Sequence, residues 1–226
     1  MMSTQSTEFG WAVGSGPPLP AHTDGQFSAV LDQIGNQRRF KRNGEIYSEG
    51  EIANCWFKVM SGAVRTTKIF EDGRRHIGQF YFEGDFFGFD KSNERIFSAE
   101  AVCDSTVMRY PRGSSERLLD TDPELARGLR EMLLNDMLNA QTRMLLLGRM
   151  NALERVTTFL IDHCRRRKGS RMVELPMSRI DIADYLGLTT ETVCRVLSSL
   201  KREGAIGIPT PHRVELRRDL VLRLVA

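Results

Sequence analysis

The 226-residue sequence has few cysteines and histidines and no long apolar run. Its four cysteines, Cys55, Cys103, Cys164 and Cys194, form no C-x-x-C pair, which argues against a zinc site or a disulfide framework. No stretch approaches the roughly 18 apolar residues that span a bilayer, and the N-terminus lacks the basic-then-apolar pattern of a signal peptide. We therefore expect a cytoplasmic protein with free thiols, no metal and no membrane contact.

The net charge of the chain is only +3, but the charged residues are unevenly distributed. Residues 1–147 hold 17 basic and 20 acidic side chains, whereas residues 148–226 hold 15 basic and 9 acidic ones. A basic C-terminal part beside an acidic N-terminal part is typical of a DNA-binding domain joined to a domain that does not bind DNA.

The N-terminal half predicts a disordered arm followed by an all-β domain. Residues 1–26 are rich in Gly, Ser and Pro and lack periodicity, so we expect them to be disordered. Residues 27–120 form the second predicted unit, in which short β-branched runs alternate with turns. The turn dipeptides are Asn43-Gly44, Glu49-Gly50, Ser61-Gly62, Asp72-Gly73 and Glu83-Gly84. Such spacing is typical of a sandwich or barrel.

Helical periodicity begins at Asp122-Pro123, and residues 121–147 predict one long helix. Thr121 or Asp122 can cap it, and proline is well placed in a first helical turn. One apolar seam follows the helix through Leu129, Leu133, Met137, Ala140, Met144 and Leu147. A long helix with one such seam favours pairing with a second copy, and the alternative is a core helix within one chain.

Residues 148–226 predict a helix, a tight turn and a second helix, followed by two short strands around Pro209-Thr210-Pro211. Ser178 is the expected N-cap of the first helix, Gly187 its left-handed end, and Thr189 or Thr190 the cap of the second. This pattern indicates a winged helix-turn-helix.

The second helix would present Thr190, Glu191, Cys194 and Arg195 outward near its start, the end that meets base edges in a major groove. Arginine suits guanine O6 and N7, and glutamate can accept from cytosine N4. Ser178 and Arg202 complete the expected DNA contacts, with Arg202 on phosphate. The alternative is an ordinary helical hairpin with a solvated charged face.

The stretch Leu186–Arg195 resembles the recognition motif of the CRP/FNR family of bacterial transcription regulators, FixK-like branch. Glu191 and Arg195 match the branch pattern, while Cys194 replaces its serine. The resemblance implies an α+β protein: a cyclic-nucleotide-binding-like β-roll (jelly roll), a dimerisation helix and a winged helix-turn-helix. It also implies a homodimer that binds a palindromic TTGA-type site and activates genes of low-oxygen respiration or nitrogen fixation.

The resemblance bears on ligands and partners as well. Family members that bind cyclic AMP hold its phosphate with an Arg-Ser pair, but here Phe97 precedes Ser98. Members with an iron–sulfur cluster carry cysteines in the N-terminal arm, and this arm has none. We expect no cofactor and no cyclic nucleotide, with a ligand-gated regulator of the same fold as the alternative. The turn within residues 71–75 would be a contact for RNA polymerase or a plain hairpin.

Cys194 allows two interpretations. A helix N-terminus and a neighbouring cation favour thiolate, so oxidation of Cys194 could disturb DNA binding. The alternative is a small side chain that contacts a thymine methyl. A thiol enzyme is not expected, because His163 and Cys164 are adjacent on one helix and do not face each other.

Overall fold

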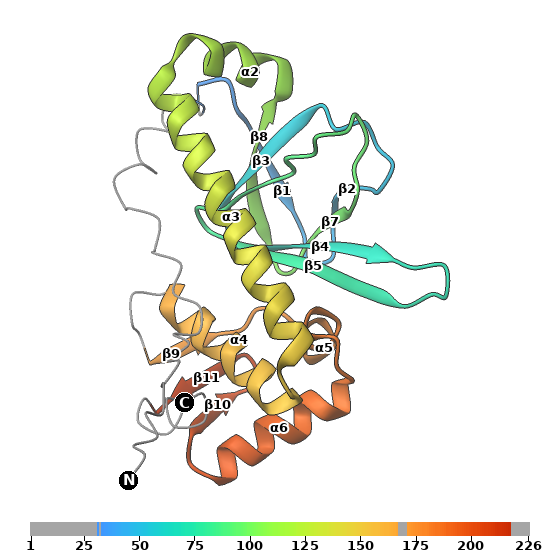
Figure 1. Ribbon diagram of the computed structural model, residues 1–226, viewed down its shortest axis with the longest axis vertical. Helices are drawn as coiled ribbons and strands as arrows, with labels where there is room; N and C mark the ends of the chain where they lie inside the picture. Colours follow the sequence, from blue (N-terminus) through green and yellow to red (C-terminus); the bar gives the residue numbers. More distant parts are fainter. Residues whose placement is uncertain (1–30, 32, 167–170, 218–226) are drawn as a thin grey trace, which may run out of the picture.

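The computed structural model describes residues 31, 33–166 and 171–217. The predicted arm over residues 1–26 lies outside the described residues. A β-roll, a long helix along its side and a winged helix-turn-helix at the far end of that helix make up the chain (Figure 1). This arrangement confirms the predicted α+β fold.

Two four-stranded antiparallel sheets form the β-roll. One has the order β1-β8-β3-β6 and the other β2-β7-β4-β5. Their strands are β1 (Asn36–Phe40), β2 (Glu45–Tyr47), β3 (Cys55–Ser61), β4 (Ala63–Ile69), β5 (Arg75–Phe82), β6 (Phe86–Phe87), β7 (Ser98–Ala101) and β8 (Ser105–Pro111). Stacked aromatic rings, such as those of Phe57 and Phe87 with centroids 5.1 Å apart, fill the space between the sheets.

The predicted turns lie between these strands, with one shift of detail. Gly50, Gly62, Gly73 and Gly84 have positive φ angles, but at the first turn Asn43 has the left-handed φ of 62° instead of Gly44. Asparagine adopts this region more readily than most residues because its short side chain bonds locally. At Gly62 a Cβ atom would lie 2.3 Å from Ser105 Oγ, so this turn requires glycine.

Helix α3 (Pro123–Arg149) is 27 residues long and matches the predicted long helix. Asp122 caps it, since its Oδ1 accepts from the backbone N–H groups of Glu124 and Leu125, both at 3.0 Å. A shorter helix that the sequence did not predict, α2 (Arg112–Thr121), lies between β8 and α3. Among the described residues, no helix is long and apolar enough to cross a membrane.

The C-terminal part contains three helices and a small sheet. The helices are α4 (Ala152–Arg166), α5 (Arg179–Leu186) and α6 (Thr190–Arg202). The predicted wing strands are β10 (Ile206–Thr210) and β11 (Arg213–Leu216), and β9 (Met172–Glu174), which the sequence did not predict, pairs with β11. Hydrophobic packing continues from the roll into this part, because Ile77 and Phe80 of β5 share one cluster with Phe159, Ile182 and Leu197.

Candidate nucleic-acid interface

Helices α5 and α6 are delimited by the caps that the sequence predicted. Ser178 and Asp181 form a reciprocal capping box at the start of α5, with both hydrogen bonds at 3.1 Å. Gly187 ends α5 with φ 63° and ψ 41°. Thr189 caps α6 by accepting from Thr192 N, so of the two predicted candidates it is Thr189 that serves. These local bonds fix the corner between the helices, and with it the direction of α6.

Helix α6 buries one face and exposes another. Val193, Leu197 and Leu200 are buried, and burying each such side chain contributes about 1.5–3 kcal/mol. The predicted base-reading residues lie on the other face: Glu191, Cys194 and Arg195 are exposed, and Thr190 is half-buried. Neither Glu191 nor Arg195 has a side-chain partner in the described part of the chain. This face therefore carries one acceptor and one forked donor that are free to bind base edges.

The two remaining predicted DNA contacts lie at the edges of this face. Arg202 is exposed at the end of α6, and its Nη2 donates to Ser199 Oγ at 3.1 Å. Ser178 is half-buried, and its hydroxyl oxygen already accepts from Asp181 N. Its O–H remains available as a donor, so the cap and a phosphate contact are compatible at Ser178.

Arg179 is a residue of this interface that sequence reasoning missed. It stands at the start of α5, its Nη2 donates to Pro211 O of the wing at 3.0 Å, and its buried Nη1 has no partner among the residues that the structure describes. Burial lowers the pKa of Arg179, and the neighbouring Cys194 opposes that shift. Arg179 of α5 is thus a second cation near the exposed Cys194 thiol, in addition to the adjacent Arg195. Adjacency in the sequence could not reveal this contact between the two helices.

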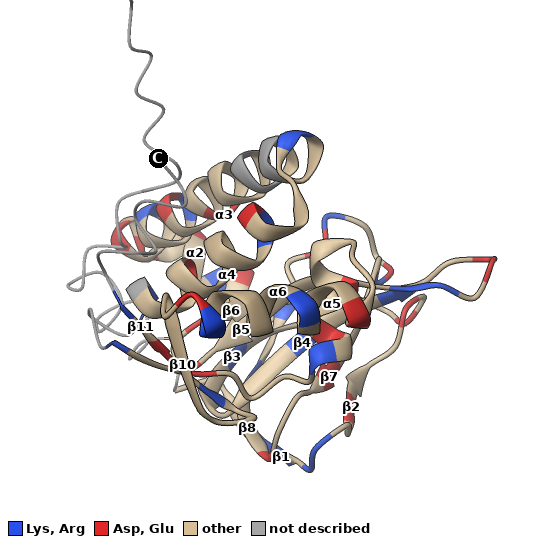
Figure 2. Cartoon of the chain, turned by 90° about the horizontal axis from the view of Figure 1, so that it is seen from below, with Lys and Arg blue, Asp and Glu red and all other residues tan. Residues whose placement is uncertain are grey.

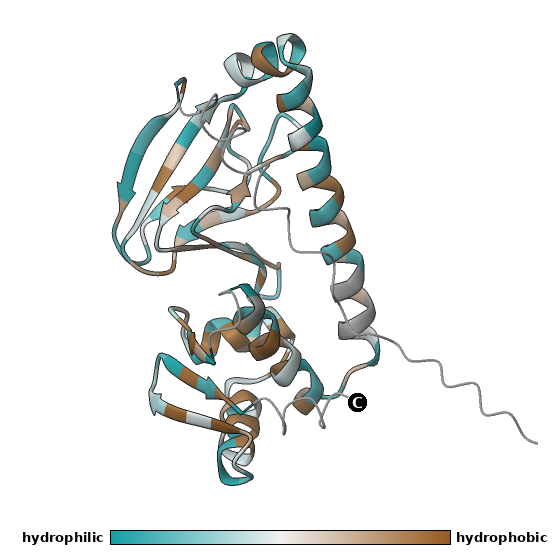
Figure 3. Cartoon of the chain, turned by 90° about the vertical axis from the view of Figure 1, so that its left-hand side faces the viewer, coloured by the Kyte–Doolittle hydropathy of each residue, from teal (hydrophilic) through white to brown (hydrophobic). Residues whose placement is uncertain are grey.

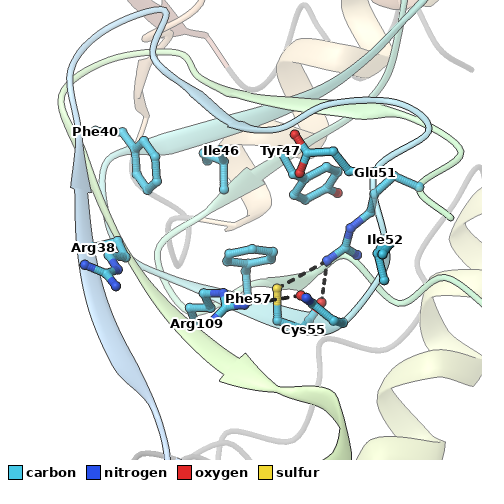
Figure 4. A pocket seen from close by; sticks show the side chains of 11 residues that line it. Arg38, Phe40, Ile46, Tyr47, Glu51, Ile52, Cys55, Phe57 and Arg109 are labelled. Atoms are coloured by element: carbon cyan, nitrogen blue, oxygen red, sulfur yellow. Dashed lines mark hydrogen bonds between the residues drawn. The ribbon is translucent and has the colours of Figure 1, made fainter. Parts of the chain in front are cut away.

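The roll contains a cavity of about 550 Å³ that opens between β1, β2, β3 and β8 (Figure 4). Its lining combines aromatic and aliphatic side chains with arginines and one glutamate: Arg38, Phe40, Ile46, Tyr47, Glu51, Ile52, Asn54, Cys55, Phe57, Arg95 and Arg109. Phe97 and Ser98, the positions that the resemblance matches to the family's phosphate-binding pair, do not line it.

Arg95 is the arginine nearest to that pair in sequence, and its guanidinium serves the roll itself. Nη1 donates to Gly88 O at 2.7 Å and pairs with Asp90 at 2.9 Å, while Nη2 donates to Cys55 O at 2.6 Å. The group also lies over the Tyr47 ring, 4.2 Å from its centroid. These partners take up Nη1 and Nη2, and Nε is buried without a hydrogen-bond partner among the described residues, so Arg95 is poorly placed to hold a phosphate.

The predicted dimerisation seam divides into two parts. Leu129 packs with Leu125 into the cluster around Tyr110 of the roll. Farther along α3, Leu133, Met137 and Met144 are 40, 50 and 74% exposed, and Ala140 is exposed as well. Leu147 is half-buried near the helix end. Hydrophobic positions recur along the coloured part of α3 in Figure 3, and the exposed ones form an apolar strip without a partner in the described chain.

The chemistry of a metal or disulfide site is not assembled here. All four cysteines are free, and among the described residues no group of three or more His, Cys, Asp or Glu side chains could hold a metal ion. His163 is buried at Nε2, and burial lowers its pKa to about 4. A neutral, aromatic-packed histidine of this kind has a structural role.

Comparison with known proteins agrees with this geometry. A family model described as a Crp-like helix-turn-helix domain matches residues 154–219, and one described as a cyclic nucleotide-binding domain matches residues 37–122. The chain is 38% identical to the nitrogen fixation regulation protein FixK of Rhizobium meliloti, over 81% of this chain and 84% of that protein. It is 42% identical to FixK of Azorhizobium caulinodans, over 86% of this chain and 80% of that protein.

A solved structure is also similar over most of its length. The structure of FixK2 from Bradyrhizobium japonicum superposes with a TM-score of 0.81 at 41% identity, and the match covers 85% of this chain and 98% of that one. The likeness extends across the roll, the long helix and the helix-turn-helix together.

Proposed function

The chain belongs to the CRP/FNR family of DNA-binding transcription regulators, and from that premise we propose that it is a FixK-like homodimeric activator. It is a transcription factor and not an enzyme. In this proposal residues 27–120 form the roll, residues 121–147 pair two copies, and residues 148–226 bind DNA. The relatives named above as nitrogen fixation regulators support targets in nitrogen fixation or low-oxygen respiration.

The observation that carries the proposal is the exposed face of α6. Arg195 can donate two parallel hydrogen bonds to a guanine, and Glu191 can accept from a cytosine. Two such faces related by a two-fold axis would read inverted half-sites about one helical turn apart. Together with the branch pattern, this favours a palindrome of the TTGA type, with Thr190 and Cys194 beside the bases and Ser178 and Arg202 on phosphates.

The exposed strip on α3 supports pairing of two copies. Leu133, Met137, Ala140 and Met144 include no charged residue, so nothing in the strip repels a second strip. We expect the protein to sediment at about twice its 25.7 kDa chain mass at micromolar concentration without added ligand. A 25.7 kDa species under these conditions would contradict ligand-free assembly.

Independence from cyclic nucleotides is part of the proposal and is supported by two positions. Phe97 replaces the family's phosphate-binding arginine, and Arg95 is occupied inside the roll. Activation would involve RNA polymerase, for which the β4–β5 hairpin around Asp72-Gly73 offers an exposed surface. The alternative, a small-molecule-gated regulator, is favoured only by the open cavity of the roll.

The test is a selection from random duplex DNA with purified, nucleotide-free protein. We expect an enriched palindrome with TTGA-type arms, and the Arg195→Ala variant should lose enrichment of the guanine. Recovery of unrelated sequences, or selection only after a cyclic nucleotide is added, would contradict the proposal.

A further inference from the structure

Arg65 of β4 is a buried arginine that joins the roll to the helix-turn-helix. Its Nη1 donates to both carboxylate oxygens of Asp181 in α5, each at 3.1 Å. Its Nε and Nη2 donate to Glu100 of the roll at 2.9 and 2.7 Å. Only 8% of the Arg65 side chain and 5% of the Asp181 side chain are exposed. The roll therefore fixes the guanidinium and directs one edge of it at the DNA-binding part.

Arg75 of β5 adds a second link to the same helix. Its Nη2 lies 2.7 Å from Asp181 Oδ1, and its Nε lies 2.8 Å from Asp184 Oδ2. Asp181 and Asp184 are three residues apart on α5, so both face the hairpin. Figure 2 shows acidic positions of α5 beside basic positions of the β4–β5 hairpin. We call Arg65, Arg75, Asp181 and Asp184 the arginine–aspartate clamp.

Because the Arg65 and Asp181 side chains are buried, their charges must be paired within the protein. Burial alone would raise the pKa of Asp181, but hydrogen bonds from Ser178 and the charges of Arg65 and Arg75 lower it. Buried charges need well-placed partners, and separation of the two domains would remove Asp181 from Arg65 and both aspartates from Arg75, leaving Arg65 with Glu100 alone. Aromatic packing reinforces the contact, because the rings of Phe80 and Tyr185 lie 5.1 Å apart. Such an interface contrasts with the mobile interfaces that usually join domains.

The clamp holds the face of α5 that points away from the DNA-binding surface. Arg179, which helical spacing places on the opposite side of α5 from the two aspartates, donates to Pro211 O of the wing, and the outward face of α6 stays open. A ligand changes a domain orientation only by binding one orientation more tightly than another. Charged groups built into the chain can supply the same preference permanently.

We propose that Arg65 and Arg75 are positioning residues that hold α5, and through it α6, in the DNA-binding orientation without a ligand. The inference rests on the proposed function, since it explains how that function needs no cyclic nucleotide. It assigns the role of an orienting ligand to two side chains of the roll.

The test uses the full-length protein with Arg75→Gln, because Arg75 is partly exposed and its loss is less disruptive than that of Arg65. The matched control is Arg74→Gln, because Arg74 pairs only locally, with Asp72 of the same hairpin. Affinity for the selected palindrome is measured over a series of salt concentrations. We expect Arg75→Gln to weaken binding about tenfold, or about 1.4 kcal/mol, with an unchanged salt dependence, and Arg74→Gln to bind like the parent.

Two further measurements separate positioning from general destabilisation. Asp184→Asn should weaken binding by less than Arg75→Gln, because Arg75 keeps Asp181, and combining the two should add little, because the Arg75–Asp184 contact is already lost. Hydrogen exchange should become faster in β5 and α5 of Arg75→Gln but remain unchanged in α6.

Parental affinity in Arg75→Gln would overturn the clamp. Tighter binding would also overturn it, because the clamp would then hold an inactive orientation. The third contradicting result is a salt dependence of Arg75→Gln that is reduced by about one phosphate contact. If the parent itself does not bind the palindrome, the proposed function fails. Hydrogen exchange then still decides whether Arg75 ties α5 to the roll, and unchanged exchange at both elements would reject the clamp.

Discussion

The β-roll and the recognition helix use their arginines in opposite ways. In the roll, Arg95 is buried, and its Nη1 and Nη2 donate to Gly88, Asp90 and Cys55 of the same domain. In α6, Arg195 is exposed and has no side-chain partner among the described residues. The roll holds the Arg95 guanidinium in its own interior, whereas α6 exposes the Arg195 guanidinium to solvent. The comparison teaches that Arg195 is open to a partner in the free chain, whereas Arg95 is held by its own domain.

The largest effect should come from removing the cation inside the roll. Arg95→Met would leave the Asp90 carboxylate unpaired, and breaking a buried pair costs about 3–5 kcal/mol of unfolding free energy. Urea unfolding measures this, with the exposed Lys91→Met as control. Parental stability in Arg95→Met would show that the cation is not structural, and the contrast between the two domains would break.

A second effect concerns acid stability near the contact of α4 with the roll. His163 has its pKa lowered to about 4 from 6.5, first by burial and then by the charge of Arg166. Its contribution is complete above pH 6.5 and is lost as the pH falls toward 4, because the unfolded chain then binds the extra proton. We expect this group to remove about 2.5 kcal/mol between pH 7 and pH 4.5.

The measurement is the unfolding free energy at these two pH values. His163→Gln should show a smaller loss than the parent, and the exposed His212→Gln should show the same loss as the parent. Equal losses in all three proteins would show that protonation of His163 does not cause the loss of stability in acid.

On the DNA-binding side, Arg195→Ala should cost about 1–3 kcal/mol at one guanine and little at other positions. Arg202→Ala, if it contacts phosphate, should weaken operator and random DNA alike. Equilibrium binding to single-base variants of the palindrome distinguishes the two. If Arg195→Ala weakened both kinds of DNA equally, the exposed arginine would be a phosphate contact like Arg202.

The smallest effect before oxidation is expected at Cys194. Cys194→Ser keeps a small polar side chain, so reduced protein should bind within about 0.5 kcal/mol of the parent. Peroxide should weaken the parent through sulfenic and then sulfinic acid, and reductant should restore only the sulfenic or disulfide form. Cys164→Ser serves as control. If Cys194→Ser lost binding to peroxide as fast as the parent, Cys194 would be a small groove contact and not a sensor.

Local signals in the sequence predicted the helix ends of the DNA-binding part and the start of the long helix. The cap at Ser178, the left-handed Gly187 and the start of α3 after Asp122 each depend on residues within three or four positions, which a sequence displays directly. The exposed face of α6 followed from helical periodicity in the same way.

Contacts between distant segments were not predictable by these means. Arg65 and Asp181 are 116 positions apart, and nothing in either segment indicates that they meet. The contact of Arg179 with Pro211 O of the wing was missed for the same reason. The short β9 was missed because three residues carry too little periodicity, and its pairing with β11 is again a tertiary contact. The role of Arg95 was not predictable for the same reason, because its buried partners come from β3 and the turn after β6.

The contrast between Arg95 held inside the roll and the open recognition helix is tested most directly by one set of four binding isotherms. Nucleotide-free protein is titrated onto the TTGA palindrome and onto the same duplex with its guanines replaced, each with and without saturating cyclic AMP. We predict tight binding to the first duplex, binding weaker by about 1–3 kcal/mol per replaced base to the second, and no change with cyclic AMP. Binding that appears only with cyclic AMP, or equal binding to both duplexes, would contradict the account.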